Sequence, residues 1–266
     1  MSNKIQWLLL LIGLLSFKLA ALDISGEWVQ GGLIVGRTDP NHQLEFLGNS
    51  VRIADDGYFV IGMGRDTSER VALIEKTATG RVITHTFNVK QRQYREQRIE
   101  GVPQKTVDVP TESLARIRQE TKLVKASRLI NSTRQDYRQT FVWPLVGTIT
   151  GVYGSRRFYN GQGRRPHYGI DIAAPKGAKV KAPASGKVIL VHDDMYFSGG
   201  TLIIDHGHGV SSTFIHLDKI LVNEGNNIEQ RQVIAEVGDS GRATGPHLDW
   251  RINWFNQRLD PQLLVD

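Results

Sequence analysis

Short strand-like runs separated by turn residues recur along almost the whole of this chain of 266 residues. Residues 58–62, 81–87 and 200–205 are examples, and each begins next to a glycine. Runs of this length, rich in Val, Ile, Thr and Phe and bounded by turns, are typical of β-strands. With 27 glycines and a hydrophobic fraction of 40%, the chain is expected to be globular and mostly β.

The N-terminus has the layout of a secretory signal peptide. Lys4 precedes an apolar run at residues 7–15, and the small residues Ala20 and Ala21 follow. The run is too short to span a bilayer comfortably. We therefore expect residues 1–21 to be a signal peptide and the protein to be periplasmic or otherwise exported, with no stable membrane span after processing.

Composition divides the rest of the chain into three predicted parts. Residues 22–100 are expected to form a small β-sandwich, either a binding or shielding module or a structural spacer. Residues 101–139 read as a linker and a helix capped by Thr111 and running to about Asn131. Residues 140–266 form the second predicted β domain. The helix is expected to show a basic surface, as a docking face for an anionic polymer or as an ordinary solvated face, made by Arg116, Arg118, Lys122, Lys125 and Arg128.

Charge and cysteine content narrow the chemistry. The formal net charge of +6 favours anionic partners. The basic residues are scattered without interleaved aromatic residues, so no nucleic-acid role is expected. The chain has no cysteine. Any metal site must therefore be built from His, Asp or Glu.

Three short stretches hold the candidate ligands: His167 with Asp171, His216, and His247 with Asp249. Side chains two apart on a strand share a face, so His247 and Asp249 point the same way. A catalytic zinc site typically uses about three nitrogen or oxygen ligands and leaves one position for water. The five groups are enough for three ligands and two catalytic helpers.

These motifs resemble the lysostaphin/LytM family of peptidoglycan zinc endopeptidases. The resemblance extends over residues 143–261 and is carried by residues 167–177, 204–207, the strand ending at His216, and 241–248. It implies an antiparallel-sheet domain with a duplicated hybrid motif and a metal at the floor of a groove. The upstream region resembles, more weakly, the β module of exported members.

The resemblance also implies roles for the residues. His167 and Asp171 match two zinc ligands, and His216 and His247 match the two helper histidines. The family's third ligand is normally a histidine where this chain has Asp249. Two Asp, one His and one divalent cation sum to zero charge instead of +1, so bound water would be less acidic and Mn²⁺ more competitive. The implied substrate is a peptide cross-link of peptidoglycan, with the D-alanyl–diaminopimelate bond as its target.

Two other functions compete with this hypothesis. The first is a catalytically inactive relative whose partner is a cell-wall amidase that it binds and activates. Asp249 supports this alternative, whereas the retained His216 and His247 oppose it. The second is a lipoyl-type carrier, suggested by residues 178–189. Such carriers hold a modified lysine in a tight hairpin, which this stretch lacks, and the export signal also argues against this function. For an active cell-wall hydrolase, we expect the β module or the linker helix to cover the groove and restrain its activity.

The other histidines and the two tryptophans near the site are expected to have structural roles. The pair His206 and His208 imitates metal-ligand spacing, but its place at a hairpin turn predicts local hydrogen bonds. Trp250 and Trp254 are expected in the core. For His42 and His85 the neighbouring sequence suggests no metal ligand.

Overall fold

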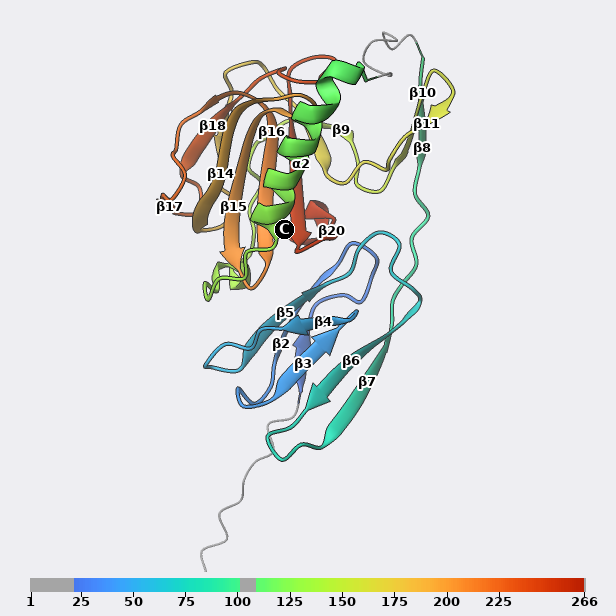
Figure 1. Ribbon diagram of the computed structural model, residues 1–266, viewed down its shortest axis with the longest axis vertical. Coiled ribbons are helices and arrows are strands. Elements are labelled where there is room, and N and C mark those ends of the chain that lie inside the picture. Colours follow the sequence, from blue (N-terminus) through green and yellow to red (C-terminus); the bar gives the residue numbers. More distant parts are fainter. Residues whose placement is uncertain (1–21, 101–108, 266) are drawn as a thin grey trace, which may run out of the picture.

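The computed structural model describes residues 22–100 and 109–265, and the predicted signal peptide and most of the predicted linker lie outside them. Antiparallel β-sheets dominate the described residues (Figure 1). This confirms the mostly β fold class expected from the sequence. Within the described ranges, no helix has the length and apolar character that crossing a membrane requires.

The N-terminal half contains two antiparallel sheets. The first has the order β1-β2-β5 and the second the order β4-β3-β6-β7. Phe46, Phe59 and Leu73 are fully buried in the core between them. Gly36 makes room for the Phe59 ring, because a Cβ there would come within 2.3 Å of it. The strands are β1 (Asp23–Ser25), β2 (Leu33–Arg37), β3 (Gln43–Phe46), β4 (Asn49–Val51), β5 (Tyr58–Gly62), β6 (Arg70–Lys76) and β7 (Val82–Asn88).

The C-terminal half is built on one large sheet. Its main path is β17-β14-β15-β16-β19-β12-β9; off this path, β18 pairs with β16 and β13, and β20 pairs with β19. The strands are β9 (Thr148–Gly151), β12 (Ile170–Ala173), β13 (Lys179–Lys181), β14 (Gly186–Met195), β15 (Gly199–Gly207), β16 (Val210–Ile220), β17 (Asn227–Ile228), β18 (Val233–Val237), β19 (His247–Trp254) and β20 (Gln257–Leu259). A small third sheet joins β8 (Glu96–Ile99) in parallel to β10 (Arg156–Tyr159), which pairs with β11 (Gln162–Gly163).

Alternation along β19 separates the two faces of the large sheet. Leu248, Trp250 and Ile252 are fully buried in the core, as was predicted for the tryptophan. The residues between them in the strand, including Asp249 and Arg251, therefore point to the opposite face. That face carries the polar groups described below.

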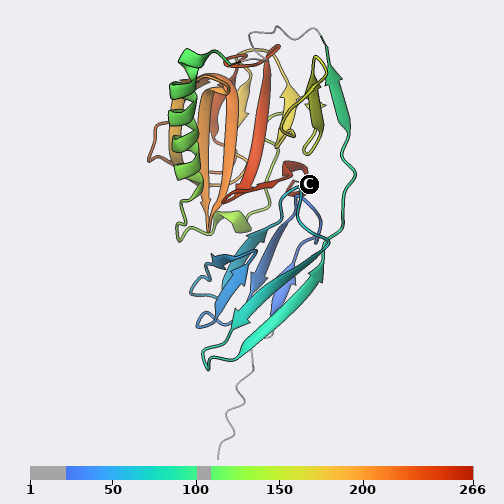
Figure 2. The same ribbon diagram turned by 45° about the vertical axis from the view of Figure 1, so that its right-hand side comes forward.

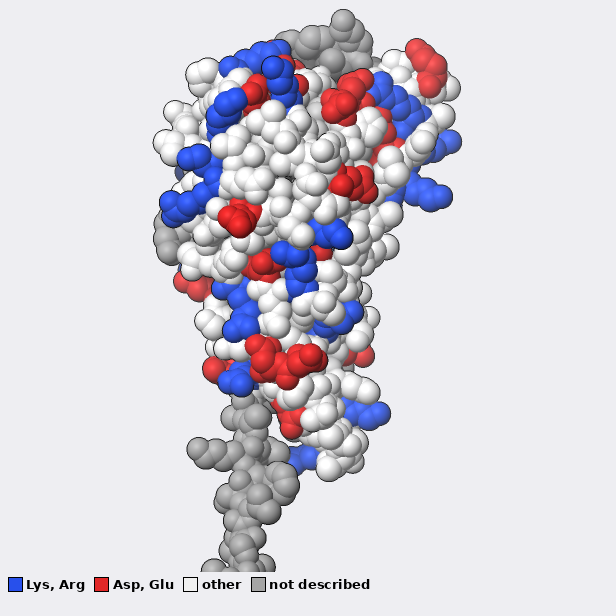
Figure 3. All heavy atoms as spheres, turned by 90° about the vertical axis from the view of Figure 1, so that its left-hand side faces the viewer, with Lys and Arg blue, Asp and Glu red and all other residues white. Residues whose placement is uncertain are grey.

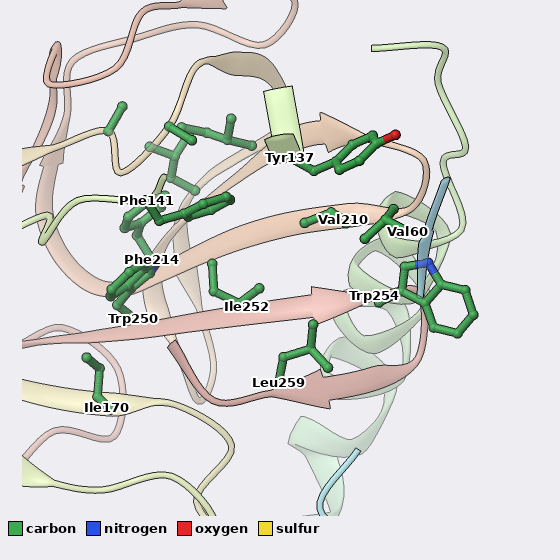
Figure 4. Packing of buried hydrophobic residues seen from close by; sticks show 14 of the residues in the cluster. Val60, Tyr137, Phe141, Ile170, Val210, Phe214, Trp250, Ile252, Trp254 and Leu259 are labelled. Carbon is green, nitrogen blue, oxygen red and sulfur yellow. The ribbon is translucent and has the colours of Figure 1, made fainter. Parts of the chain in front are cut away.

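The two halves share a hydrophobic core. Trp254 packs against Phe46 with ring centroids 6.1 Å apart, and a Cβ on Gly62 would meet Trp254 at 2.6 Å. Figure 4 shows Val60 of the N-terminal half beside Trp254 and Leu259 of the C-terminal half. At the edge of this contact Arg92 pairs with the buried Asp260 at 2.8 Å. The boundaries drawn from composition remain predictions.

Helix α2 (Leu114–Arg128) lies across the polar face of the large sheet, along β14 to β16 (Figures 1 and 2). Val124 packs on the small apolar cluster of Leu190, Met195 and Ile203. Glu120 accepts a hydrogen bond from the backbone N–H of Tyr196 at 2.9 Å.

Three sequence predictions about this helix were wrong. A short 3₁₀ turn, Thr111–Ser113, comes first and Thr111 does not cap it. The helix ends at Arg128 and not near Asn131. Arg128 is only 7% exposed and is therefore not part of a basic surface, because the strands beneath α2 cover it. Two further 3₁₀ turns, Asp136–Arg138 and Pro261–Leu263, flank the large sheet.

Glu75 joins the two histidines of the N-terminal half, a contact that their sequence neighbourhood did not suggest. The buried carboxylate lies 2.8 Å from His42 Nδ1 and 2.8 Å from His85 Nε2, and the Thr38 hydroxyl donates to it. Burial raises the pKa of Glu75, but these hydrogen bonds lower it more, so the pKa lies below its usual value. The carboxylate is thus stabilised in the folded state.

Replacing this carboxylate should destabilise the protein. We expect Glu75→Gln to lower the free energy of unfolding at neutral pH by about 1.5–3 kcal/mol, because hydrogen bonds to a charged group are lost. In the parent protein the contribution of Glu75 is present above its unfolded pKa of about 4.3 and is lost as the pH falls toward its lower folded pKa. Urea unfolding at several pH values measures both effects. Glu45→Gln, on the exposed side of β3, is the control; equal stability of the two variants would contradict the prediction.

Candidate metal centre

His167, Asp171 and Asp249 converge on one point of the polar face. His167 Nε2 lies 3.0 Å from Asp171 Oδ1 and 3.3 Å from Asp249 Oδ2. One ligand atom from each residue can be chosen so that all three lie within 4.8 Å of one another. All three residues are buried. One imidazole nitrogen and two carboxylate oxygens form a donor set that suits zinc.

Backbone pairing brings these residues together. Asp171 and Asp249 are direct partners in the antiparallel register of β12 and β19. Their side chains share the polar face because Ile170, Ile172 and Trp250 take the core positions. His167 precedes β12 and is fixed by two backbone hydrogen bonds, one to the carbonyl of Ser155 and one from the N–H of Gly154.

His216 and His247 lie beside this cluster, with ring centroids 4.8 Å apart. Each Nδ1 is 2.8 Å from a backbone carbonyl, Ser240 for His216 and Gly245 for His247. A carbonyl can only accept a hydrogen bond, so both Nδ1 atoms carry the hydrogen. The Nε2 of each neutral ring is consequently a proton acceptor, and His247 Nε2 lies 3.9 Å from Asp171 Oδ1. Burial also lowers the pKa of His216.

His216 owes its orientation to a break in strand alternation. The prediction that the strand ends at this residue was wrong, because β16 continues to Ile220. His216 has a φ of 65°, and the register with β18 shifts directly after it, between Leu217 and Lys219. A bulge of this kind turns a side chain toward the other face of the sheet. Here it brings the imidazole next to His247, away from the core side occupied by Phe214.

Arg251 is the residue of this centre that the sequence analysis missed. Its Nε and Nη2 donate to Asp249 Oδ1 and Oδ2 at 2.9 and 2.6 Å, a two-pronged pair. Gly169 makes room for the pair, since a Cβ there would lie 2.5 Å from Arg251 Cγ and 2.6 Å from Asp249 Oδ1. Arg251 follows Asp249 by two residues on the same strand, and this spacing could have predicted that both side chains share a face. The guanidinium supplies one positive charge. It thereby offsets the charge difference that arises when aspartate replaces the family's histidine.

The charged groups of this centre shift one another's pKa values. Burial raises the pKa of Asp249, but Arg251 and His167 together hold it well below its usual range. Burial lowers the pKa of His167, while Asp249 and Asp171 raise it by more, so the net shift is upward. The two carboxylates thus favour positive charge at the point where His167 Nε2 lies.

Removing the two-pronged pair between Arg251 and Asp249 should weaken metal binding. We expect Arg251→Met to lower zinc affinity by about 10–100-fold, as is typical when the partner of a ligating carboxylate is lost. Competition against a chromogenic chelator measures this affinity. Arg251→Lys keeps the charge but cannot form the two-pronged pair, and should fall between the parent and Arg251→Met. Unchanged affinity in Arg251→Met would show that Asp249 needs no orienting partner.

The remaining histidines of the large sheet take no part in this centre. His206 Nδ1 lies 2.6 Å from the Ser185 carbonyl and its Nε2 lies 2.8 Å from Ser212 Oγ. His208 packs against Tyr137, with ring centroids 5.0 Å apart. His206 thus bonds within its own hairpin to Ser212, as predicted, but its other partner and those of His208 come from segments distant in the sequence.

A solved structure matches almost the entire protein. It is described as a putative peptidase M23 from Pseudomonas aeruginosa; the match has a TM-score of 0.71 and 30% identity, covering 90% of this chain and 95% of that one. The chain belongs to peptidase family M23. The family model itself matches residues 165–261, a range that contains all five residues of the predicted M23 site.

Curated relatives resemble the M23 part. Peptidoglycan DD-endopeptidase ShyB of Vibrio cholerae is 40% identical over 131 residues, which are 49% of this chain and 30% of that protein. DD-carboxypeptidase/endopeptidase Mpg of Neisseria meningitidis is 38% identical over 119 residues, 44% of this chain and 27% of that protein. The chain thus spans less than a third of the length of these two relatives.

Proposed function

We propose that this M23 protein is a zinc-dependent endopeptidase that hydrolyses peptide cross-links of peptidoglycan. The observation that carries the proposal is the placement of three candidate ligands and two proton-accepting imidazoles on one face of the sheet. The names of the relatives from Vibrio cholerae and Neisseria meningitidis support peptidoglycan as the substrate class. The D-alanyl–diaminopimelate bond, which the family resemblance implies, is the target that we propose.

His167 Nε2, Asp171 and Asp249 would hold the zinc ion. When bound there, zinc supplies a Lewis acid for the scissile carbonyl and lowers the pKa of a bound water. Arg251 orients Asp249 through both of its carboxylate oxygens. Because the guanidinium also balances the second aspartate, the site carries the same total charge as one with two histidines and one aspartate.

His216 and His247 handle the protons of the reaction. The carbonyls of Ser240 and Gly245 fix both rings with Nε2 as the acceptor. Either Nε2 can take a proton from the attacking water, and a protonated imidazole can then donate a hydrogen bond to the oxyanion or a proton to the leaving amine. The order in which the two histidines act is left open.

An amidase-activating regulator is the less favoured alternative. Its support in the sequence was the replacement of the family's histidine by Asp249, and Arg251 offsets the negative charge that this aspartate adds. A regulator would also have no use for two imidazoles fixed as proton acceptors. The predicted signal peptide and the proposed substrate agree with a periplasmic or otherwise exported location.

Digestion of purified peptidoglycan sacculi tests the proposal. The mature protein is incubated with sacculi and zinc, and the soluble products are identified by mass spectrometry. We expect uncross-linked muropeptides that are absent after treatment with a chelator and return with added zinc. A protein with bound zinc that releases no such products would overturn the endopeptidase proposal and favour the regulator.

A further inference from the structure

A cavity of about 230 Å³ lies between α2 and the polar face of the large sheet. Its wall is strongly basic: Lys125 and Arg128 come from the helix, Arg251 and Arg258 from β19 and β20, and Arg165 from the loop before His167. On the outer face drawn in Figure 3, by contrast, basic and acidic residues are interspersed. Positive charge is thus concentrated inside this cavity.

Arg128 is a buried cation of the cavity wall that has no counter-ion among the described residues. The residue is 7% exposed, its Nε has no hydrogen-bond partner, and no hydrogen bond or ion pair joins its guanidinium to any described residue. Burial and the neighbouring Arg258 and Arg251 lower the pKa of Arg128 well below its usual range. A buried charge without a partner is strongly destabilising. The arrangement is therefore incomplete without an anion.

The neighbouring groups do not neutralise Arg128. Arg258 donates to Asn253 Oδ1 at 2.6 Å, and burial, together with Arg251, lowers its pKa to about 10. Glu120 also lines the cavity, but its two oxygens accept from Arg116 Nε and from the N–H of Tyr196. Asp249 is shared between Arg251 and His167.

A second polar group in the wall also lacks a partner. The hydroxyl of Thr213, which is 2% exposed, makes no hydrogen bond to a described residue. Thr213 is the register partner of Arg251 on the adjacent strand, so both side chains face the cavity. Buried polar groups in folded proteins nearly always have partners. An unpaired guanidinium and an unpaired hydroxyl in one cavity indicate a missing ligand that accepts hydrogen bonds.

We propose that this cavity binds a carboxylate group between Arg128, Arg251 and Arg258. Guanidinium groups match a carboxylate in both charge and planar geometry. At about 30 Å³ per water-sized group, the volume suits a small carboxylate-bearing fragment. The carboxylate can come from the substrate or from a soluble small acid.

The substrate source rests on the proposed function, whereas the anion site itself does not. In a D-alanyl–diaminopimelate bond, the carbon bonded to the scissile nitrogen also carries a free carboxylate. Arg251 touches both Asp249 and the cavity, so a carboxylate held there would lie next to the proposed zinc ligands. Binding at this position would select substrates whose cross-link ends in a free acid.

Calorimetric titration of the full-length, zinc-containing protein tests the site. The probes are glutarate, as a soluble carboxylate, and an uncross-linked stem peptide that ends in diaminopimelate. We expect Arg128→Gln and Arg258→Gln each to weaken binding of the tighter probe at least about 10-fold. Arg118→Gln, on the exposed side of α2, is the matched control and should bind as the parent does.

The two probes separate the sources of the carboxylate. A stem peptide that binds at least about 10-fold more tightly than glutarate assigns the site to the substrate, and similar affinities assign it to a soluble acid. Binding of neither probe, or binding unaffected by both substitutions, would overturn the proposal. These titrations do not require hydrolysis, so they remain readable if the sacculi assay fails. Far-UV circular dichroism confirms that each variant is folded.

Discussion

Asp249→Ala should lose bound zinc and peptidoglycan digestion together. The substitution removes one of the three candidate ligand groups, and a catalytic zinc site with two protein ligands is not expected to retain its ion. It also leaves Arg251 partly buried without its carboxylate, which typically costs about 3–5 kcal/mol for a buried pair. Zinc per protein chain is measured by elemental mass spectrometry, digestion by muropeptide release, and stability by urea unfolding.

The control for this variant is Asp239→Ala. Asp239 is exposed in the loop before β19 and pairs with Lys176 at the surface, so zinc content and digestion should not change. Asp249→His introduces the residue that the family normally has, but it leaves Arg251 without an acceptor. We therefore expect it to regain zinc while remaining less stable than the parent. Full zinc occupancy and full digestion in Asp249→Ala would exclude Asp249 as a ligand.

His247→Ala should keep its zinc and lose digestion by about 10²–10⁴-fold, the usual contribution of a positioned acid or base. His247 Nε2 is an acceptor close to the ligands without belonging to the cluster of three. His216→Ala is expected to behave in the same way. The double variant should lose little more than either single variant, because groups that act in one proton-transfer step are not additive.

Zinc content and initial digestion rates of the same preparations measure this prediction. His192→Ala is the control, because this half-exposed histidine on β14 lies outside the centre. Loss of zinc in His247→Ala would reassign the residue as a ligand. Digestion at the parent rate would remove it from the mechanism.

Local strand geometry made part of this centre predictable. His247 and Asp249 share a face because they are two apart on β19, and this requires no knowledge of the partner strands. The convergence of His167 with Asp249 was inferred from a family resemblance, and its physical basis is the register of β12 on β19. A pairing between strands more than 70 residues apart in the chain cannot be derived from the spacing within either strand.

Two features depended on contacts that no local pattern reports. The bulge at His216 arises where β16 changes its pairing with β18, so alternation alone would have placed this ring in the core. Arg128 has the sequence spacing of a solvated helix face and is buried because α2 lies on the sheet. The position of Arg251 on the face of Asp249 could be predicted from strand alternation, since the two residues are two apart on β19. Its role emerged only from the hydrogen bonds to the carboxylate.

The shared core around Trp254 decides how this protein can be dissected. A chain shortened to begin near Arg138 would lose α2 and also the residues of the N-terminal half that cover Trp254 and Leu259. The newly exposed apolar surface would favour aggregation, so altered activity in such a fragment would not report on α2 alone. A single change that loosens the helix, such as Glu120→Ala, leaves the junction intact and separates displacement of α2 from damage to the fold.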